Sequence, residues 1–182
     1  MRARDNPFRS ERLDRLAFRY PPGLDRPSLL RRLAELGHRA AIVGPEGSGK
    51  TTLSRDLEQA LGGDYRIWRV TRHRGERRLA RALPRLGSAD YVILDGADQL
   101  GWAEFRWLRR RARRAGGLLV LSHRPGLLPT LIVTTTSQAL LDTLAAELAP
   151  GDIGEPSALE QHRGNIREAL RARYDRCAEA AG

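Results

Sequence analysis

Gly44-Pro45-Glu46-Gly47-Ser48-Gly49-Lys50-Thr51 matches the phosphate-loop pattern G-x-x-x-x-G-K-[ST], the Walker A pattern, at every fixed position. Glycines let such a loop turn tightly enough for its backbone N–H groups to surround phosphate oxygens. In this pattern the Lys50 ammonium reaches the terminal phosphates, and the Thr51 hydroxyl ligates Mg²⁺. The stretch therefore predicts a nucleotide site over residues 44–52, with Thr52 as its last member.

Lys50 is also the single lysine of a chain that has 31 arginines. An ammonium is a compact point charge on a flexible stem, whereas a guanidinium is planar and demands a particular geometry. We interpret the one retained lysine as the group that suits the phosphate, which agrees with its place in the loop.

The bulk composition indicates a folded domain with acidic partners. A length of 182 residues suits one domain, and 41% hydrophobic residues are enough for a core. The formal net charge of +10 favours nucleotides, nucleic acid, acidic protein surfaces or membrane headgroups. Cys177, as the one cysteine, permits no intramolecular disulfide and no cysteine metal cluster. No signal peptide and no apolar run of about 18 residues is visible, so we expect a cytoplasmic protein without a membrane span.

Short apolar segments alternate with helical patterns along the chain, which predicts an α/β fold with a parallel sheet covered on both faces, a three-layer sandwich. The segments expected to be strands are 40–43, 65–70, 91–94, 118–121 and 131–133. The segments expected to be helices are 27–36, 51–61, 75–86, 102–115, 137–148 and 157–178. Asp25 or Ser28 is the expected cap of the first helix. The glycine loop falls between a strand and a helix, as the phosphate-loop interpretation requires.

A second acidic site follows the third predicted strand. Val92-Ile93-Leu94-Asp95 is an apolar run that ends in a carboxylate. In phosphate-loop proteins an aspartate at this place takes part in the Mg²⁺ shell, so Thr51 and Asp95 are the predicted metal residues. The alternative is that Asp95 or Asp98 simply caps the next helix.

Leu94-Asp95-Gly96-Ala97-Asp98 resembles the hhhhDG-x-[DE] form of the second motif in STAND and NACHT ATPases, which are relatives of the AAA+ ATPases in the additional-strand class of P-loop proteins. The resemblance implies ATP and Mg²⁺ as ligands, a sheet ordered 5-1-4-3-2, and Asp98 as the water activator. Most AAA+ proteins have a glutamate directly after the metal aspartate. Gly96 at that position implies slow hydrolysis.

Two further stretches are similar to the sensor motifs of that class. Leu119-Val120-Leu121-Ser122-His123-Arg124-Pro125 is similar to sensor 1, which implies that Ser122 or His123 contacts the γ-phosphate or the attacking water and that Arg124 balances charge. Gly164-Asn165-Ile166-Arg167-Glu168 resembles sensor 2, which implies that Arg167 reaches the nucleotide from a lid helix. The alternatives are an exposed loop pair at His123 and Arg124, and a solvated helix arginine at Arg167. The expected catalytic set is Lys50, Asp98, Ser122, Arg124 and Arg167.

The organisation expected from these motifs has three parts. Residues 1–37 form an N-terminal prelude with a helix, 38–149 form the ATPase core, and 150–182 form a small helical lid. The boundary at 150 coincides with a Pro/Gly-rich break over 150–156. Only about 30 residues follow that boundary, so the lid has room for two helices.

Arginine-rich stretches suggest partners other than the nucleotide. Residues 106–114 hold six arginines in nine positions, and residues 69–85 hold a second group. Such clusters are typical of nucleic-acid binders, but no sequence-reading motif accompanies them. The alternatives are a solvated face and an acidic protein or phospholipid partner. Whether the chain forms an oligomer stays open.

Together these features predict an ATP-binding P-loop protein, a slow AAA+/STAND-like ATPase that acts as a regulatory switch or is stimulated by a partner. The alternatives are a nucleic-acid-binding accessory ATPase and a small-molecule kinase.

Overall fold

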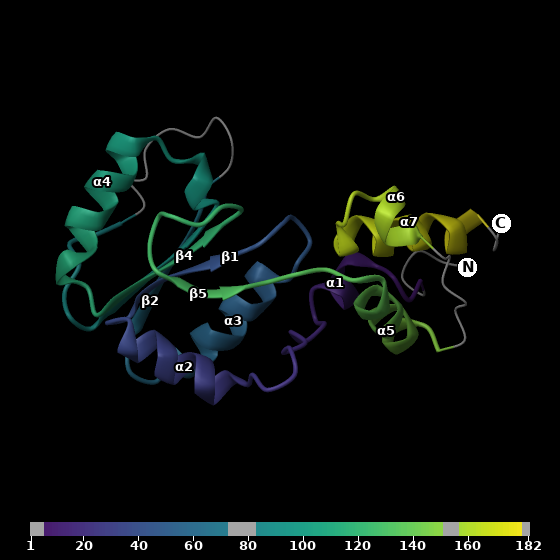
Figure 1. Cartoon of the computed structure of the whole chain (residues 1–182), viewed down its shortest axis with the longest axis horizontal. Helices are drawn as coiled ribbons and strands as arrows, with labels where there is room; N and C mark the ends of the chain where they lie inside the picture. The colour runs from purple at the N-terminus through teal and green to yellow at the C-terminus, as the bar shows by residue number, and fades with distance from the viewer. Residues whose placement is uncertain (1–5, 73–82, 151–156, 180–182) are drawn as a thin grey trace. The chain divides into compact units, whose positions relative to one another are not determined.

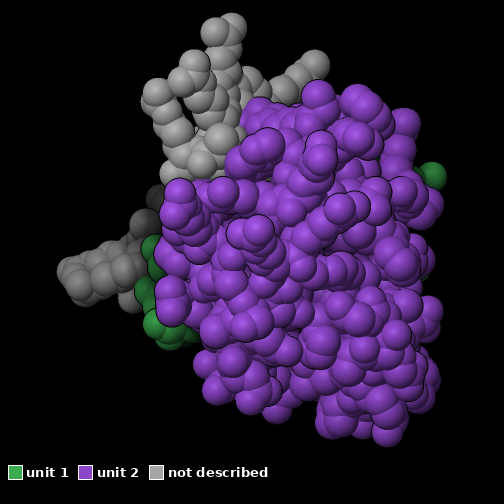
Figure 2. All heavy atoms as spheres, turned by 90° about the vertical axis from the view of Figure 1, so that its left-hand side faces the viewer, with its two compact units in different colours: residues 1–17, 45–52, 134–182 green, residues 18–44, 53–133 purple. Residues whose placement is uncertain are grey.

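The computed structural model describes residues 6–72, 83–150 and 157–179 (Figure 1). Contacts divide the chain into two compact units (Figure 2). Unit 1 comprises residues 1–17, 45–52 and 134–182, and unit 2 comprises residues 18–44 and 53–133. The helix predicted over 75–86 falls largely outside the described residues. We describe each unit by itself.

Unit 2 contains a five-stranded parallel sheet with the order β2-β3-β4-β1-β5 (Figure 1). Its strands are β1 Arg39–Val43, β2 Arg66–Thr71, β3 Asp90–Asp95, β4 Gly117–Ser122 and β5 Thr130–Val133. This order is the predicted 5-1-4-3-2 read from the opposite edge. All five predicted strands are therefore confirmed, with ends that differ by no more than one residue.

The burial of each strand explains its sequence. The inner strands β1, β3 and β4 are buried almost throughout, because helices cover both faces of the sheet. The edge strand β2 is only partly buried and carries Arg66 and Arg69. Charges on an edge strand discourage pairing with another chain, so β2 has the composition expected of an edge.

Helices form a layer on each face of the sheet, which confirms the three-layer α/β class. On one face, α2 Arg26–Glu35 and α3 Lys50–Leu61 contribute leucines to a core with β1, β3, β4 and β5. On the other face, α4 Trp102–Arg111 and the 3₁₀ turn η4 Ala112–Arg114 pack through Phe105, Leu108 and Ala112. Both predicted cap residues of α2 take part: the Ser28 N–H donates to the Asp25 carboxylate at 2.8 Å, and the Asp25 N–H donates to the Ser28 hydroxyl at 3.1 Å.

Unit 1 is helical and has its own core. Its helices are α1 Ser10–Leu13, α5 Gln138–Leu148, α6 Ala158–Gln161 and α7 Ile166–Glu179. The helical sequence expected over 157–178 is divided into two helices, because Arg163 (φ 53°) and Gly164 (φ 81°) take left-handed conformations that end α6 before α7 begins. None of the helices in the described segments has both the length and the apolar character that a membrane span would need.

The N-terminal segment packs with the C-terminal helices in unit 1. Phe8 is 1% exposed and lies in the same core as Leu141 and Leu170. The Asn6 amide donates to the Tyr174 carbonyl at 2.8 Å, and its oxygen accepts from the Phe8 N–H at 3.0 Å. Residues 6–13 therefore belong to the core of the helical unit. The functional division at 37/38 and 149/150 stays a prediction.

Gly117 makes room for a buried tyrosine at the start of β4. It lies opposite Tyr91 in the β3–β4 register, and Tyr91 is fully buried. A Cβ at Gly117 would lie 2.1 Å from a ring carbon of Tyr91. Tyr65 packs edge-on against the Tyr91 ring, with the two ring centroids 5.3 Å apart, so the tyrosine has little freedom to move away.

Replacing Gly117 with alanine should lower the free energy of unfolding by about 1–3 kcal/mol, the usual cost of overpacking a core. Gly101→Ala is the matched control, because Gly101 has a φ of −67° and no heavy atom within 4 Å of an added Cβ. Urea denaturation of the two variants makes the comparison. Equal stability for Gly117→Ala and Gly101→Ala would contradict the packing described for Tyr91.

Candidate functional site

The predicted phosphate loop leaves the carboxyl end of β1 and leads into α3. The Gly44 N–H donates to the Ser122 carbonyl at the end of β4, at 3.1 Å. Gly47 (φ +71°) and Gly49 (φ +84°) are left-handed, a conformation that side chains disfavour. The helix begins at Lys50, so the loop ends in a first helical turn whose N–H groups have no acceptor within the helix. Such a turn is suited to an anion.

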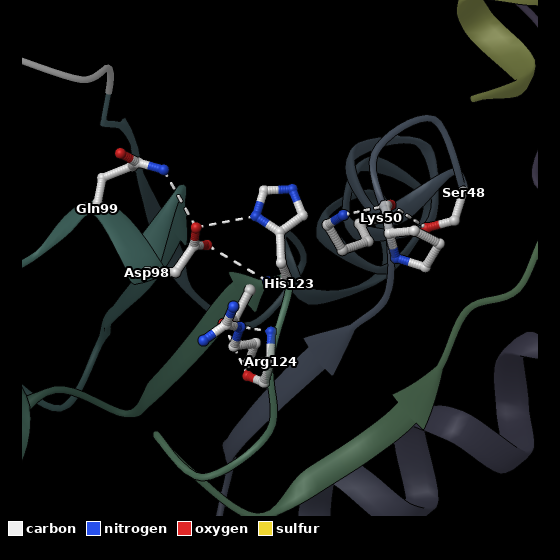
Figure 3. Close-up of polar contacts among 8 residues, drawn as sticks. Ser48, Lys50, Asp98, Gln99, His123 and Arg124 are labelled. Atoms are coloured by element: carbon white, nitrogen blue, oxygen red, sulfur yellow. Dashed lines mark hydrogen bonds and ion pairs between the residues drawn. The ribbon is translucent and has the colours of Figure 1, made fainter. Parts of the chain in front are cut away.

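Inside the loop, the Pro45 carbonyl accepts two hydrogen bonds (Figure 3). It accepts from the Ser48 hydroxyl and from the Lys50 ammonium, each at 2.7 Å. The Ser48 hydroxyl also lies 2.7 Å from the Thr134 hydroxyl. The Ser48 hydroxyl donates its single hydrogen to the Pro45 carbonyl. Its oxygen therefore accepts the hydrogen bond from the Thr134 hydroxyl. Ser48 is only 5% exposed and therefore supports the loop from within.

The remaining loop residues differ in exposure. Pro45 and Glu46 are exposed, whereas Thr51 and Thr52 are half-buried in the first turn of α3. Asp95, the other predicted metal residue, is the last residue of β3 and is half-buried. In the described segments no three His, Cys, Asp or Glu side chains are grouped to hold a metal ion. A hydroxyl and a carboxylate nevertheless suit Mg²⁺, which prefers oxygen and keeps several waters or phosphate oxygens as ligands.

Gly96 explains why no glutamate follows Asp95. It is left-handed, with a φ of +80°, and a Cβ there would lie 2.5 Å from the Arg72 carbonyl oxygen. A side chain is therefore excluded at this position. The left-handed turn leads into the 3₁₀ turn η3 Ala97–Gln99, which carries Asp98.

Asp98 is hydrogen-bonded to His123 (Figure 3). Its Oδ2 lies 2.9 Å from His123 Nδ1 and accepts from the Gln99 amide at 3.2 Å, and its Oδ1 accepts from the His123 N–H at 3.4 Å. Burial raises the pKa of Asp98, but the hydrogen bonds and the charge of His123 outweigh it, so the pKa lies below its ordinary value. The capping alternative is wrong for Asp95 and Asp98, because Gly96 and Gly101 precede η3 and α4.

Ser122 and Arg124 form a tight turn at the end of β4. The Ser122 hydroxyl donates to the Arg124 carbonyl at 2.8 Å and accepts from the Arg124 N–H at 3.2 Å. Ser122 is 1% exposed, whereas the side chains of His123 and Arg124 are exposed. The structure thus uses the Ser122 hydroxyl to shape the turn, and the predicted catalytic roles of Ser122 and Arg124 stay predictions.

The start of α7 contacts the phosphate loop within unit 1. Asn165 precedes α7, and its side chain accepts from the Glu168 N–H at 3.2 Å. A Cβ at Gly47 would lie 2.1 Å from the same Asn165 oxygen and 2.9 Å from the Ile166 backbone nitrogen, so the loop lies close to the start of α7. Arg167 forms an ion pair with Asp14. Partial burial lowers the pKa of Arg167, whose side chain is 48% exposed.

The structure thus brings the predicted site residues together in two groups. In unit 2, Asp95, Asp98 and residues 122–124 lie at the carboxyl ends of β3 and β4. In unit 1, residues 45–52 lie beside residues 164–166. The sequence analysis missed the contacts of Thr134, Asn165 and Asp14. The polar run that follows the fifth strand was a signal for the contact of Thr134. Nothing in the sequence near Asp14 indicated that it pairs with Arg167.

Comparisons with known proteins identify solved structures that have a similar fold. No protein-family model matches the chain, and no curated protein matches it. Among solved structures, it is similar to Cdc6p from Pyrobaculum aerophilum, with a TM-score of 0.55, 18% identity, and coverage of 91% of this chain and 63% of that one. It is also similar to the RuvB Holliday junction branch migration motor from Thermotoga maritima, with a TM-score of 0.54, 20% identity, and coverage of 81% and 60%.

This chain therefore spans about three fifths of those two proteins. At such identities the likeness shows the fold alone. The likeness agrees with the five-stranded parallel α/β fold described above.

Proposed function

We propose that this chain binds ATP with Mg²⁺ through residues 44–52 and is a slow, partner-stimulated ATPase of the AAA+/STAND type. The loop is the observation that carries the proposal. It has every fixed residue of the phosphate-loop pattern, it takes left-handed conformations at Gly47 and Gly49, and it stands between β1 and α3 of an AAA+-type fold. The sequence, the backbone conformation and the topology each supply one of these features.

Phosphate binding is assigned to the first turn of α3 and to Lys50. The N–H groups of this turn and the positive end of the helix favour an anion. The Lys50 ammonium is held by the neutral Pro45 carbonyl at 2.7 Å. Exchange of that carbonyl for a charged phosphate oxygen is favourable, because charge-assisted hydrogen bonds are roughly twice as strong as neutral ones.

Thr51 and Asp95 are the residues that would hold Mg²⁺. Within the sheet, Val43 pairs with Ser122 and Asp95 pairs with Leu121, so β1 and β3 end at the same edge. The loop leaves the sheet at the edge that carries Asp95, as the metal assignment requires. A bound Mg²⁺ would offset the negative charge of the phosphates.

Asp98 is the residue proposed to orient the attacking water, with Ser122 and Arg124 as further members of the catalytic set. Its lowered pKa means that it is ionised at neutral pH and is a weak base. The glutamate that usually follows the metal aspartate is excluded by the turn at Gly96. Both features favour slow hydrolysis by the isolated chain, which suits a switch that waits for a partner.

The helices α6 and α7 are proposed to act as a nucleotide-sensing lid through Arg167. Asn165 lies against Gly47, so the start of α7 is already beside the loop. Arg167 is held by Asp14. We propose that the γ-phosphate competes with Asp14 for this guanidinium, so that ATP and ADP leave the lid in different states.

Lys50→Ala should weaken the binding of ATP·Mg²⁺ by about tenfold or more, because a hydrogen bond to a charged group contributes roughly 1.5–3 kcal/mol. Isothermal titration of the full chain measures the affinity. Arg55→Ala is the matched control: Arg55 is an exposed cation of α3 outside the loop, and its removal should leave the affinity within about twofold. Equal affinity for wild type and Lys50→Ala would contradict the proposed function.

Steady-state turnover of the isolated protein should be slow, and Asp98→Asn should lower it further, by about tenfold or more. His123→Phe removes groups that lower the pKa of Asp98, so the pKa should rise and the acid limb of the kcat profile should move to higher pH. Phosphate release measured across pH checks both effects. A turnover of about tens per second without a partner, or an Asp98→Asn rate equal to wild type, would show that the catalytic group is misassigned.

Arg167→Ala should reduce the preference for ATP over ADP several-fold while leaving the affinity for ADP nearly unchanged. Asp14→Asn should have the opposite effect on that preference, because it releases Arg167 for the γ-phosphate. Arg176→Ala removes an exposed arginine nine positions further along α7 and is the control. The lid assignment fails if titrations with ATP and ADP give the same ratio of affinities for all four proteins.

A further inference from the structure

Helix α4 and the turn η4 display one side made almost entirely of arginines and a tryptophan. The spacing of these residues is that of one helical face, and we call this face the α4 stripe. Its members are Trp102, Arg106, Arg109, Arg110 and Arg113. The neighbouring side packs on the sheet through Phe105, Leu108 and Ala112, which are all buried. The sheet contacts therefore fix the direction in which the stripe faces.

The stripe borders a groove within unit 2. The groove has a volume of about 550 Å³, and its apolar floor includes Phe105 and Leu118. Gly126, Leu127 and Leu128 line it together with the stripe, and Arg39 brings the arginines to five. No acidic side chain among the described residues lines it. The groove therefore combines an apolar floor with cationic walls.

The arginines of the stripe are not neutralised by acidic neighbours. In the described part of the chain, none of its four arginines has a carboxylate within 4 Å, although other arginines of unit 2, such as Arg69 and Arg72, are paired. Arg39 is instead bound to the carbonyls of Arg113 and Ala115. A cluster of like charges without counter-charges repels itself, so an anionic partner would relieve the repulsion.

Trp102 gives the groove an aromatic platform. It is 78% exposed. Among the other large apolar side chains of the described segments, only Leu24 and Val133 are exposed. The Arg106 guanidinium lies 5.6 Å from the centroid of its ring. A flat ring flanked by a guanidinium is suited to a planar base on one side and a phosphate next to it.

We propose that the α4 groove binds single-stranded nucleic acid, with arginines on the phosphates and a base stacked on Trp102. A nucleic acid carries both phosphates, which suit the arginines, and planar bases, one of which can stack on the single tryptophan of the stripe. An acidic peptide would satisfy the arginines alone, and a duplex would hide the faces of its bases. The stripe covers twelve residues, roughly 18 Å of helix, which is enough for a few nucleotides. This site uses no residue of the phosphate loop and stands independently of the ATPase proposal.

The test is the binding of a fluorescein-labelled oligothymidylate of about 20 nucleotides to the full chain, followed by anisotropy over a series of salt concentrations. Arg109→Gln/Arg110→Gln should weaken binding by about tenfold or more and reduce the salt slope by about 1–2. Arg31→Gln/Arg55→Gln removes the same charge from exposed positions on α2 and α3. If the two double variants lose affinity equally, the attraction is general and the groove is not the site.

Trp102 distinguishes stacking from charge attraction. Trp102→Ala should lose about tenfold in affinity, whereas Trp102→Phe should keep most of it, because a ring can still stack. Binding should also quench tryptophan fluorescence in the wild type, and this quenching should shrink in Trp102→Phe. The proposal would be overturned if Trp102→Ala bound the oligothymidylate as tightly as the wild type, or if the wild type preferred the duplex. It would also be overturned if polyglutamate bound as tightly as the oligothymidylate and with the same dependence on Trp102, which would favour an acidic protein partner.

Discussion

The backbone between β1 and α3 is the constraint on which the rest of the candidate site depends. It must pass from a buried parallel strand to a helix within a few residues, and it does so with left-handed turns at Gly47 and Gly49. A side chain at Gly47 would meet both an unfavourable φ and the Asn165 amide. The same turns fix where α3 begins, and we propose that the phosphates of ATP bind at its first turn.

A second left-handed glycine turn, at Gly96 in unit 2, determines which acidic side chain follows β3. Gly96 lies so close to the Arg72 carbonyl oxygen that a side chain does not fit. Most AAA+ proteins have a glutamate at this position, directly after the metal aspartate. The acidic group proposed to orient the attacking water is instead Asp98, whose carboxylate is hydrogen-bonded to His123. This pairing keeps the carboxylate ionised but makes it a weaker base. For this reason we propose that the chain holds a nucleotide more readily than it hydrolyses one and that a partner stimulates hydrolysis.

Much of the fold could be predicted because it depends on local patterns. Short apolar runs identified each strand to within a residue, since inner parallel strands are buried on both faces. The strand order did not follow from periodicity and came from the resemblance to AAA+ and STAND proteins. The helical sequence expected over 157–178 is divided because Arg163 and Gly164 are left-handed, and of these two residues Gly164 was the visible signal for a break.

Long-range partners were beyond the sequence patterns. Arg167 pairs with Asp14, 153 positions away, and Asp98 pairs with His123, 25 positions away. A pair of this kind is created by packing, and its members carry no shared local signal. The arginines on α4 were visible in the sequence, but only the sheet contacts of Phe105, Leu108 and Ala112 showed which of them face the same groove.

The central claim is that residues 44–52 hold the phosphates of ATP. A crystal structure of the full chain with Mg²⁺ and a non-hydrolysable ATP analogue tests it most directly. The account predicts β- and γ-phosphate oxygens within hydrogen-bond distance of the backbone N–H groups of residues 47–51, and a Lys50 ammonium that has moved from the Pro45 carbonyl to the phosphates. A nucleotide bound elsewhere, or a Lys50 that remains on Pro45 while the analogue is bound, would contradict it.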